Sequence, residues 1–306
     1  MNYQELLQDV THDRKSGAWL VARKAIACLD ALIKEKSSAD ITELIHEVEH
    51  VSSEILKSQP GMAQLTNLFN AIFETIENES SKNGVVLARK ISGEAKRFEE
   101  VAKKAVAKVA EFGAALIAED SEVLVHSNSS TVFEILKKVH ETGKTFQVIL
   151  TESRPIGEGH ACAEELAKLG VHSIFLIDAA VSKGVDRADI VLLGADSVSE
   201  NTMVNKIGTK GICLLCRESD VPCYAVAESS KFSPQNLNPK KEHPRDPNEV
   251  WDSPPAETSV QNYYFDTVPL DLFTGIISEE GILTPSEIGG RIRSQKVSPK
   301  LREQLK

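Results

Sequence analysis

Residues 123–131 read Val-Leu-Val-His-Ser-Asn-Ser-Ser-Thr. The first four form an apolar, β-branched run, and an amphipathic segment over 131–142 follows the small polar residues. A short apolar run that leads through small polar residues into a helical pattern is typical of a strand that turns into a helix. The stretch therefore predicts a strand–turn–helix unit, the building block of an α/β sheet.

The same alternation continues along the rest of the chain. Segments of helical spacing, such as 161–169 and 206–219, separate further apolar runs. The runs are Val123–His126, Phe146–Thr151, Ser173–Ile177, Ile190–Leu193 and Pro222–Ala227. Strands that alternate with helices predict βαβ units, and hence an α/β fold whose mostly parallel sheet is covered on both faces.

A polar residue follows each of the five runs. These residues are Ser127, Glu152, Asp178, Asp196 and Glu228. Parallel strands place their carboxyl ends at one edge of the sheet, which is where ligands bind in open α/β sheets. We therefore expect these side chains to converge on one site, although polar residues can also end strands without forming any site.

Upstream of the strands, over 1–118, the pattern is helical. Apolar residues recur at helical spacing after residue 18, and Asp40 is the expected N-cap of one helix. Another helix is expected to open at Pro60, and a break near Gly93 is expected to precede a longer helix over 94–118.

Composition excludes several classes of protein. The 306 residues carry 35 Lys and Arg against 45 Asp and Glu, a net charge of -10, which argues against a nucleic-acid binder. No apolar run approaches the ~20 residues of a membrane span, and the polar, acidic start is wrong for a secretory signal. Five cysteines, an odd number, favour the reducing cytosol. We expect a cytoplasmic protein that contacts neither membrane nor nucleic acid.

The small polar residues after the first strand are a candidate anion site. Ser129, Ser130 and Thr131 stand where a helix begins, and orphan backbone N–H groups and the helix dipole favour a phosphate there. A simple N-cap would need only one of these residues.

Charged residues near the same edge extend the candidate site. Asp196 follows an apolar strand, and apolar surroundings raise a carboxyl pKa, which suits a proton donor. Lys206, expected at the start of the next helix, and Lys231, after the last strand, could each meet a phosphate as a point charge. The alternatives are a turn-forming aspartate and solvated surface lysines.

Other motifs predict no cofactor. Cys213 and Cys216 lie in an apolar helical segment without a second ligand pair and are expected in the core. The histidines show no metal-ligand spacing, and no nucleotide-binding glycine motif is present, so neither a metal nor a nucleotide cofactor is expected. The proline-rich segment 232–262 predicts a lid, an interface or a mobile loop, and the charged tail 291–306 is expected to fray.

Five segments occur in an order that resembles one family. They are Thr151–Pro155, Asp178–Ala180, Gly194–Ser197, Asn205–Thr209 and Ala227–Phe232. The series is similar to the regulatory alpha, beta and delta subunits of translation initiation factor 2B and to two related isomerases. Those enzymes act on ribose 1,5-bisphosphate and methylthioribose 1-phosphate. The likeness extends from Gly17 to Pro285.

The resemblance implies a helical N-terminal domain over 1–118 and a Rossmann-like domain over 119–306, of the NagB/RpiA/CoA-transferase-like kind. It also implies a sugar-phosphate pocket and two-fold dimers, or larger assemblies, through the second domain. In the enzymes, a cysteine and the aspartate of a Gly-Ala-Asp element transfer protons while an aldose 1-phosphate is converted into a ketose 1-phosphate, and no cofactor is needed.

Carried over residue by residue, the resemblance assigns roles to ten positions. It implies catalytic positions at Asp196 and Ser127. It implies substrate-binding positions at Gly17, Ala18, Ser129, Ser130, Thr131, Asn205, Lys206 and Lys231.

The departures from the family pattern concern the chemistry. The catalytic cysteine position holds Ser127, whose hydroxyl is far less acidic than a thiol. Ser16 and Gln59 replace two phosphate-binding arginines, although Arg14 or Lys15 could substitute for the first. Glu158 replaces a substrate-binding glutamine and would repel phosphate if it pointed inward. Losing one bidentate arginine contact costs about 1.5–3 kcal/mol of binding.

Three hypotheses follow from the sequence. The first is a regulatory or weakly catalytic protein like the alpha subunit of initiation factor 2B, which binds a phosphorylated sugar or nucleotide-derived metabolite and can join other subunits of that factor. The second is an aldose–ketose isomerase of the ribose 1,5-bisphosphate type, in which Ser127 replaces the thiol. The third is a metabolite-binding dimer without a role in translation.

Overall fold

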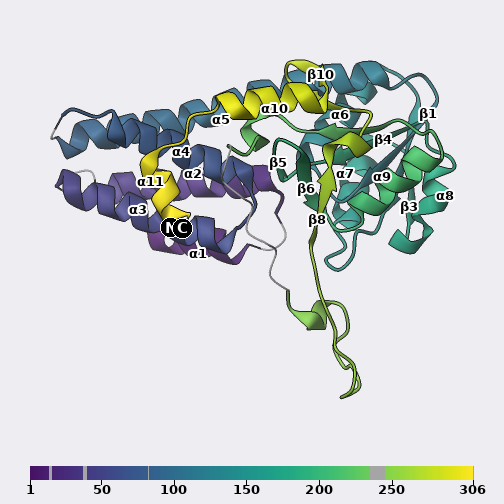
Figure 1. The fold of residues 1–306 in the computed structure, drawn as a ribbon, viewed down its shortest axis with the longest axis horizontal. Helices are drawn as coiled ribbons and strands as arrows, with labels where there is room; N and C mark the ends of the chain where they lie inside the picture. Colours follow the sequence, from purple (N-terminus) through teal and green to yellow (C-terminus); the bar gives the residue numbers. More distant parts are fainter. Residues whose placement is uncertain (14–15, 37–39, 82, 235–244, 306) are drawn as a thin grey trace.

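The chain folds into a helical half and a sheet-containing half that lie side by side (Figure 1). The computed structural model describes residues 1–13, 16–36, 40–81, 83–234 and 245–305. Arg14 and Lys15, the two candidate replacements for a phosphate-binding arginine, lie outside the described residues, as does 235–244 of the proline-rich segment. None of the described helices is both long enough and apolar enough to cross a bilayer.

The helical half is built from amphipathic helices around a shared core. They are α1 (Tyr3–His12), α2 (Ala18–Glu35), α3 (Ile41–Ser58), α4 (Ala63–Glu77) and α5 (Gly84–Leu116). Asp40 caps α3 by accepting a hydrogen bond from the N–H of Thr42, as predicted. The prediction that a helix opens at Pro60 was wrong, because α4 begins three residues later, after the left-handed turn at Gly61.

Helix α5 connects the two halves. The predicted break near Gly93 was wrong, since the helix runs without interruption from Gly84 to Leu116. Leu87 and Ile91 in its first part pack into the core of the helical half, whereas Val109 in its last part packs against the sheet. A single long helix therefore belongs to both cores and fixes how the halves sit against each other (Figure 1).

The second half contains a seven-stranded sheet with the order β10-β9-β7-β4-β1-β2-β3. Its strands are β1 (Ser121–His126), β2 (Phe146–Thr151), β3 (Ser173–Leu176), β4 (Ile190–Gly194), β7 (Cys223–Val226), β9 (Gly275–Ser278) and β10 (Gly281–Leu283). All neighbours pair in parallel except β9 and β10. The predicted α/β fold with a mostly parallel sheet is confirmed.

Helices cover both faces of this sheet. One face packs against α5, α6 (Ser130–Glu141) and α7 (Gly159–Leu169), and the other against α8 (Val181–Val185), α9 (Thr209–Glu218) and α10 (Pro285–Ser294). Along β1, Val123 and Val125 enter the first core and Leu124 enters the second. This alternation explains why the central strands read as continuous apolar runs.

A second, three-stranded antiparallel sheet has the order β5-β6-β8, and most of it was not predicted. Its strands are β5 (Ser197–Val198), β6 (Thr202–Lys206) and β8 (Phe265–Pro269). Lys206 was expected to begin a helix, but it ends β6, and α9 starts only after Gly208 at a φ of +102°. The left-handed conformation at Gly208 separates the strand from the helix, a role that glycine fills without strain.

The C-terminal tail returns to the helical half. The prediction that 291–306 frays was wrong over its described residues. Helix α10 extends to Ser294, and α11 (Pro299–Gln304) follows it. Leu301 of α11 is fully buried in the core of the helical half, and the N–H of Ser298 donates to the Oδ1 atom of Asn70. The two ends of the chain consequently lie close together (Figure 1).

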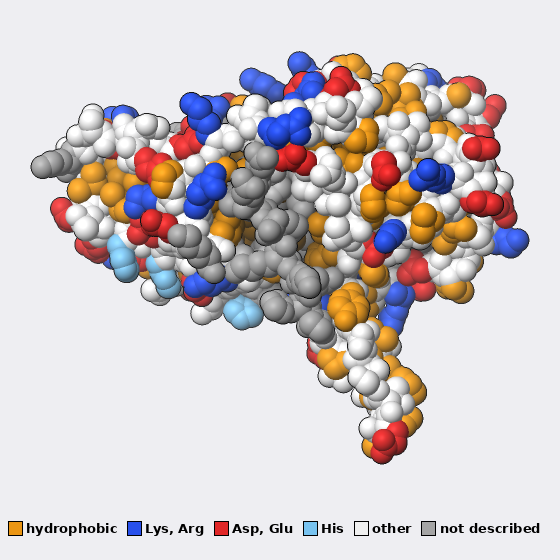
Figure 2. All heavy atoms as spheres, viewed as in Figure 1, with side chains coloured by type: hydrophobic (Ala, Val, Ile, Leu, Met, Phe, Trp, Pro, Cys, Tyr) orange, Lys and Arg blue, Asp and Glu red, His pale blue; other side chains and the backbone are white. Residues whose placement is uncertain are grey.

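Residues 250–263 form an arm that projects from the body of the molecule (Figure 2). A short 3-10 turn at 247–249 precedes the arm, and β8 follows it. Its base is fixed, because the Nδ2 atom of Asn262 donates to the backbone oxygen of Asp246 and to a carboxylate oxygen of Glu249, both at 2.7 Å. The base also contacts the sheet half, since the guanidinium of Arg154 donates to the backbone oxygen of Glu249 at 3.1 Å.

Candidate functional site

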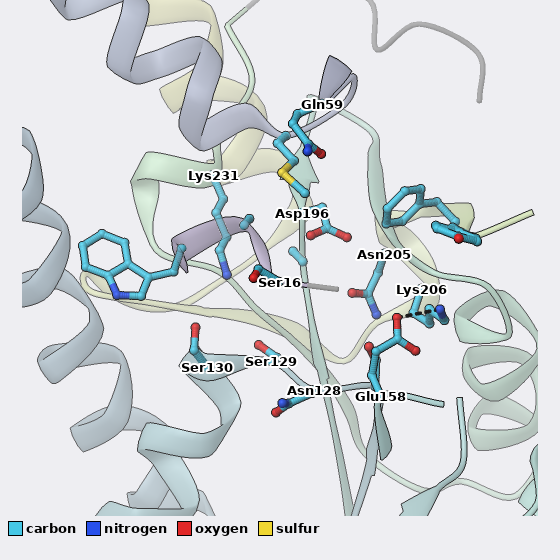
Figure 3. Close-up of a pocket in the computed structure, with 18 of the residues that line it drawn as sticks. Ser16, Gln59, Asn128, Ser129, Ser130, Glu158, Asp196, Asn205, Lys206 and Lys231 are labelled. Carbon is cyan, nitrogen blue, oxygen red and sulfur yellow. Dashed lines mark hydrogen bonds and ion pairs between the residues drawn. The ribbon is translucent and has the colours of Figure 1, made fainter. Parts of the chain in front are cut away.

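A cavity of about 110 Å³ lies at the carboxyl edge of the sheet, where the helical half covers it (Figure 3). It is lined by residues from both halves of the chain. They are Asp13, Ser16, Gly17, Ala18, Trp19, Gln59, Pro60, Met62, Ser127, Asn128, Ser129, Ser130, Glu158, Ala195, Asp196, Asn205, Lys206, Lys231, Arg245, Tyr264 and Phe265. The wall is strongly polar, as expected where parallel strands end.

The loop after β1 forms the floor of the cavity. Ser127 has a φ of +69°, and its N–H donates to the Oγ atom of Ser153 at 2.8 Å. Ser129 then caps α6 by accepting from the N–H of Val132. With Ser129 as the cap, the first turn of α6 and the exposed Ser130 face the cavity (Figure 3).

His126 precedes this loop but does not belong to the cavity. Its ring is buried, its Nε2 atom lies 2.7 Å from the backbone oxygen of Ile207, and its Nδ1 atom lies 2.5 Å from Oγ1 of Thr151. Because a carbonyl oxygen only accepts, Nε2 carries the proton and Nδ1 accepts from the threonine hydroxyl. Burial lowers the pKa of His126, so the ring is held neutral.

A second helix N-terminus faces the same cavity. Gly17 is the N-cap of α2 and has no side chain to bond the first N–H groups, which leaves them available to a ligand. The loop before it is held by Gln59, whose Nε2 atom donates to the backbone oxygens of Val10 and Asp13 at 2.9 and 2.8 Å. Gln59 thus supports the N-terminus of α2 through the backbone.

Lys231 supplies a positive charge to this end of the cavity. The residue is 3% exposed, and its ammonium donates to Oγ1 of Thr131 at 3.1 Å and lies 3.6 Å from the buried carboxylate of Glu228. Thr131 lies behind the lysine and is not among the described residues that line the cavity. Gln64 completes the buried network by donating to Glu228 at 2.6 Å.

Asp196 stands in the middle of the cavity wall, just past the end of β4 (Figure 3). Two backbone hydrogen bonds fix its position. The N–H of Asp196 donates to the backbone oxygen of Val204, and the backbone oxygen of Asp196 accepts from the N–H of Ala63. Desolvation raises the pKa of Asp196 to about 6, although Lys231 and Lys206 oppose the shift. A carboxyl with a pKa near neutrality can both give and take a proton.

The far end of the cavity is formed by Asn205, Lys206 and Glu158. Asn205 donates from Nδ2 to Oγ1 of Thr209 at 2.9 Å, while its side chain faces the cavity (Figure 3). Lys206 is paired with Glu158 at 2.7 Å, and its ammonium lies 5.1 Å from the ring centre of Tyr264. This end therefore carries charges of both signs.

The structure brings together nine of the ten residues that the resemblance assigned to the site. Thr131 is the tenth, and its hydroxyl lies behind Lys231. Of the five strand-end residues expected to converge, Ser127 and Asp196 line the cavity. Asp178 instead accepts from the backbone N–H groups of Ser153 and Arg154, and Glu228 is buried behind Lys231.

Sequence reasoning missed several lining residues. Trp19 counts as one more apolar position in a helical pattern, and nothing in that pattern distinguishes it. Arg245 and Tyr264 flank the arm, and no periodicity connects them to the sheet edge; in space, the Arg245 guanidinium lies 4.9 Å from the ring centre of Tyr264. Within the described part of the chain, no group of three or more His, Cys, Asp or Glu residues could hold a metal ion.

The fold and the cavity together define a class: a Rossmann-like α/β protein whose N-terminal helices close a polar, ligand-sized cavity at the carboxyl edge of a parallel sheet. Residues 14–285 match the Initiation factor 2 subunit family. The chain belongs to this family.

Two relatives of similar identity carry different names. A ribose 1,5-bisphosphate isomerase of Archaeoglobus fulgidus is 31% identical, with 92% of this chain and 90% of the relative covered. A putative translation initiation factor eIF-2B subunit 2-like protein of Pyrococcus abyssi is 35% identical, with 92% and 96% covered. These sequence identities therefore do not decide whether the chain is more like the isomerase or more like the initiation factor subunit.

Solved structures show the same fold. A translation initiation factor eIF-2B of Pyrococcus horikoshii superimposes with a TM-score of 0.82 at 30% identity, covering 95% of this chain and 98% of that one. A 5-methylthioribose 1-phosphate isomerase of the same organism has a TM-score of 0.78 at 23% identity, covering 95% and 87%.

Proposed function

We propose that this protein is a regulatory member of its family, like the alpha subunit of initiation factor 2B. In this proposal the cavity binds a phosphorylated sugar or a nucleotide-derived metabolite, and the protein catalyses isomerisation weakly or not at all. Two features of the cavity carry the proposal. One end, called the phosphate end, is formed by Lys231 and the N-termini of α2 and α6, and position 127 lacks an acidic group.

The phosphate end is supported by two helix N-termini and one ammonium group. The N-termini of α2 and α6 both face the cavity, and each offers backbone N–H groups and a favourable dipole. The ammonium of Lys231 lies between them, as Figure 3 shows by its position opposite Ser130 and Ser16. Gly17 packs against the loop after β1, since a β-carbon there would be in ordinary van der Waals contact, at 3.7 Å, with the backbone oxygen of Asn128.

Weak catalysis is supported by the surroundings of Ser127. A serine hydroxyl needs a neighbouring base before it can carry protons. His126 is the nearest base in the sequence, but both of its ring nitrogens are already engaged, one with Thr151 and the other with Ile207. A phosphate-binding end without an activated proton carrier at position 127 favours ligand binding over turnover.

A second candidate function is aldose–ketose isomerisation, and Asp196 favours it. A carboxyl with a pKa of about 6 in a cavity is suited to move a proton at neutral pH. Several relatives are named ribose 1,5-bisphosphate isomerase. In this candidate Asp196 is the acid and base, and Ser127 is the second proton carrier.

The proposal also includes assembly. We expect a two-fold dimer, and partner subunits of initiation factor 2B where they exist, because the 35%-identical relative carries that factor's name. Light scattering of the purified 33.5 kDa chain would show about twice the monomer mass. A monomer at micromolar concentration would contradict this part of the proposal alone.

Ligand binding is tested by calorimetry with ribose 5-phosphate and AMP on the wild type and on Ser130→Asp. An aspartate in the first turn of α6 suits the helix dipole and preserves the fold, but it repels a phosphate. We expect at least tenfold weaker binding with an unchanged melting temperature. Binding that is absent in the wild type, or unaffected by Ser130→Asp, would reject the phosphate site.

Turnover is tested by following the sugar phosphate by NMR at high protein concentration. The regulatory proposal expects no ketose product. Product formation that disappears in Asp196→Asn would establish the isomerase instead.

A further inference from the structure

The two ends of the cavity differ in charge. At the far end, Oε1 of Glu158 lies 2.7 Å from Nζ of Lys206, and the two side chains are 19% and 4% exposed. At this distance the carboxylate neutralises the ammonium. Lys206 therefore cannot offer its full charge to an anionic ligand. Lys231, at the other end, lies farther from its carboxylate partner, at 3.6 Å from Glu228, and acts together with two helix N-termini.

One carboxylate oxygen of Glu158 has no hydrogen-bond donor among the described residues. This oxygen, Oε2, is buried. A buried carboxylate oxygen without a donor is costly, and it gains free energy when a ligand supplies an O–H or N–H group. A phosphate dianion has no hydrogen to donate, so it cannot satisfy this oxygen.

A second carboxylate strengthens the asymmetry. Asp196 lines the same cavity as Glu158, and both carboxyl groups face it (Figure 3). The negative charges of these two carboxyl groups oppose the positive charges of Lys206 and Arg245, which disfavours a second phosphate group beside Glu158. Asn205 adds a neutral amide that can bond a hydroxyl.

We propose that Glu158 makes this cavity selective for monophosphates whose opposite end carries free hydroxyl groups, and makes it reject ligands with a second phosphate. This inference rests on the proposed phosphate-binding function and adds to it the class of ligand. The phosphate group occupies the end formed by Lys231, α2 and α6. The hydroxyl groups occupy the end formed by Glu158, Lys206 and Asn205.

The test compares two ligands that differ by one phosphate group. Calorimetry measures the dissociation constants of ribose 5-phosphate and ribose 1,5-bisphosphate for the wild type, Glu158→Gln and Glu134→Gln. Glu134 lies on the outer face of α6, paired with Lys137 at 3.7 Å, so its variant makes the same change in net charge outside the cavity.

We expect the wild type to bind the monophosphate at least tenfold more tightly than the bisphosphate. Glu158→Gln frees Lys206 and removes the repulsion, so it should narrow that ratio at least tenfold, mainly by tighter binding of the bisphosphate. Glu134→Gln should leave the ratio unchanged.

The outcomes separate this inference from the function on which it rests. If the wild type binds the bisphosphate as tightly as the monophosphate, the selectivity is wrong while the phosphate site stands. If Glu158→Gln folds and the ratio stays the same, Glu158 is not its cause, and the inference is likewise overturned. If neither ligand binds the wild type, both the proposed function and this inference fail.

Discussion

The backbone of Gly194, at the end of β4, lies directly against the side chain of Ser129, the N-cap of α6. A β-carbon at position 194 would stand 2.5 Å from both Cβ and Oγ of Ser129. Real β-carbons do not approach other atoms so closely, so only glycine lets β4 and the start of α6 meet here. The first turn of α6 owes its place in the cavity to this contact.

Gly194→Ala should therefore displace the start of α6. We expect a loss of about 1–3 kcal/mol in the free energy of unfolding, as for other overpacked cores, together with weaker binding of ribose 5-phosphate. Urea denaturation and calorimetry measure the two effects.

Gly93→Ala is the matched control. Gly93 lies inside α5, and a β-carbon there has nothing within 4 Å. The same substitution should stabilise the protein by about 0.5–1 kcal/mol, because alanine is the better helix former. A Gly194→Ala variant as stable as the wild type would show that the contact with Ser129 can relax.

Position 127 can be probed with a single thiol. The five cysteines are all buried, and burial raises the pKa of Cys28 and of Cys162 to about 12. A thiol reagent such as DTNB should not react with them in the native protein. Ser127→Cys should add one thiol that reacts within minutes and that ribose 5-phosphate protects.

Two results of the thiol experiment would contradict this prediction. A reactive thiol in the native wild type would show that a buried cysteine becomes exposed. In the Ser127→Cys variant, an introduced thiol that reacts at the same rate with and without a saturating sugar phosphate would place the ligand elsewhere.

Gln59 supports the site from behind. Its amide donates to the backbone oxygens of Val10 and Asp13, and it is 7% exposed. Gln59→Ala leaves buried carbonyl oxygens with fewer donors and should cost about 1–3 kcal/mol of stability. Gln8→Ala, at an exposed position of α1, should stay within about 0.5 kcal/mol of the wild type in urea. Equal stabilities of the two variants would mean that Gln59 does not hold the loop.

Most of the main sheet could be predicted from the sequence because its central strands are buried on both faces. Five of its six parallel strands read as apolar runs, and the predicted Phe146–Thr151 coincides with β2. The small sheet escaped prediction for the opposite reason. Strand β6 mixes Met203 with polar residues, and the turn at Gly208 joins it to a helix so closely that the two read as one segment.

The cavity could be predicted only in part, because several of its walls depend on contacts between distant segments. Strand ends identify Ser127 and Asp196, since chain direction places them at one edge. The ion pair between Glu158 and Lys206 joins residues 48 positions apart, and no local sequence pattern predicts it. Tyr264 lies on the cavity because β8 pairs with β6, in a sheet that the sequence did not reveal.

Asp196 should make stability depend on pH in a definite direction. Desolvation raises its pKa from 3.8 to about 6, so the folded protein binds this proton more tightly than the unfolded chain does. Its contribution to stability is therefore most favourable at low pH, falls as pH rises from about 4 to about 6, and stays constant above that range.

Asp196→Asn removes the charge, and its gain in stability should be about 1–2 kcal/mol larger at pH 8 than at pH 4.5. Asp252→Asn, on the exposed arm, should show no such difference in urea denaturation at the two pH values. If Asp196→Asn gains equally at both, or loses more at pH 8, then the two lysines outweigh burial and the carboxylate is stable as the anion.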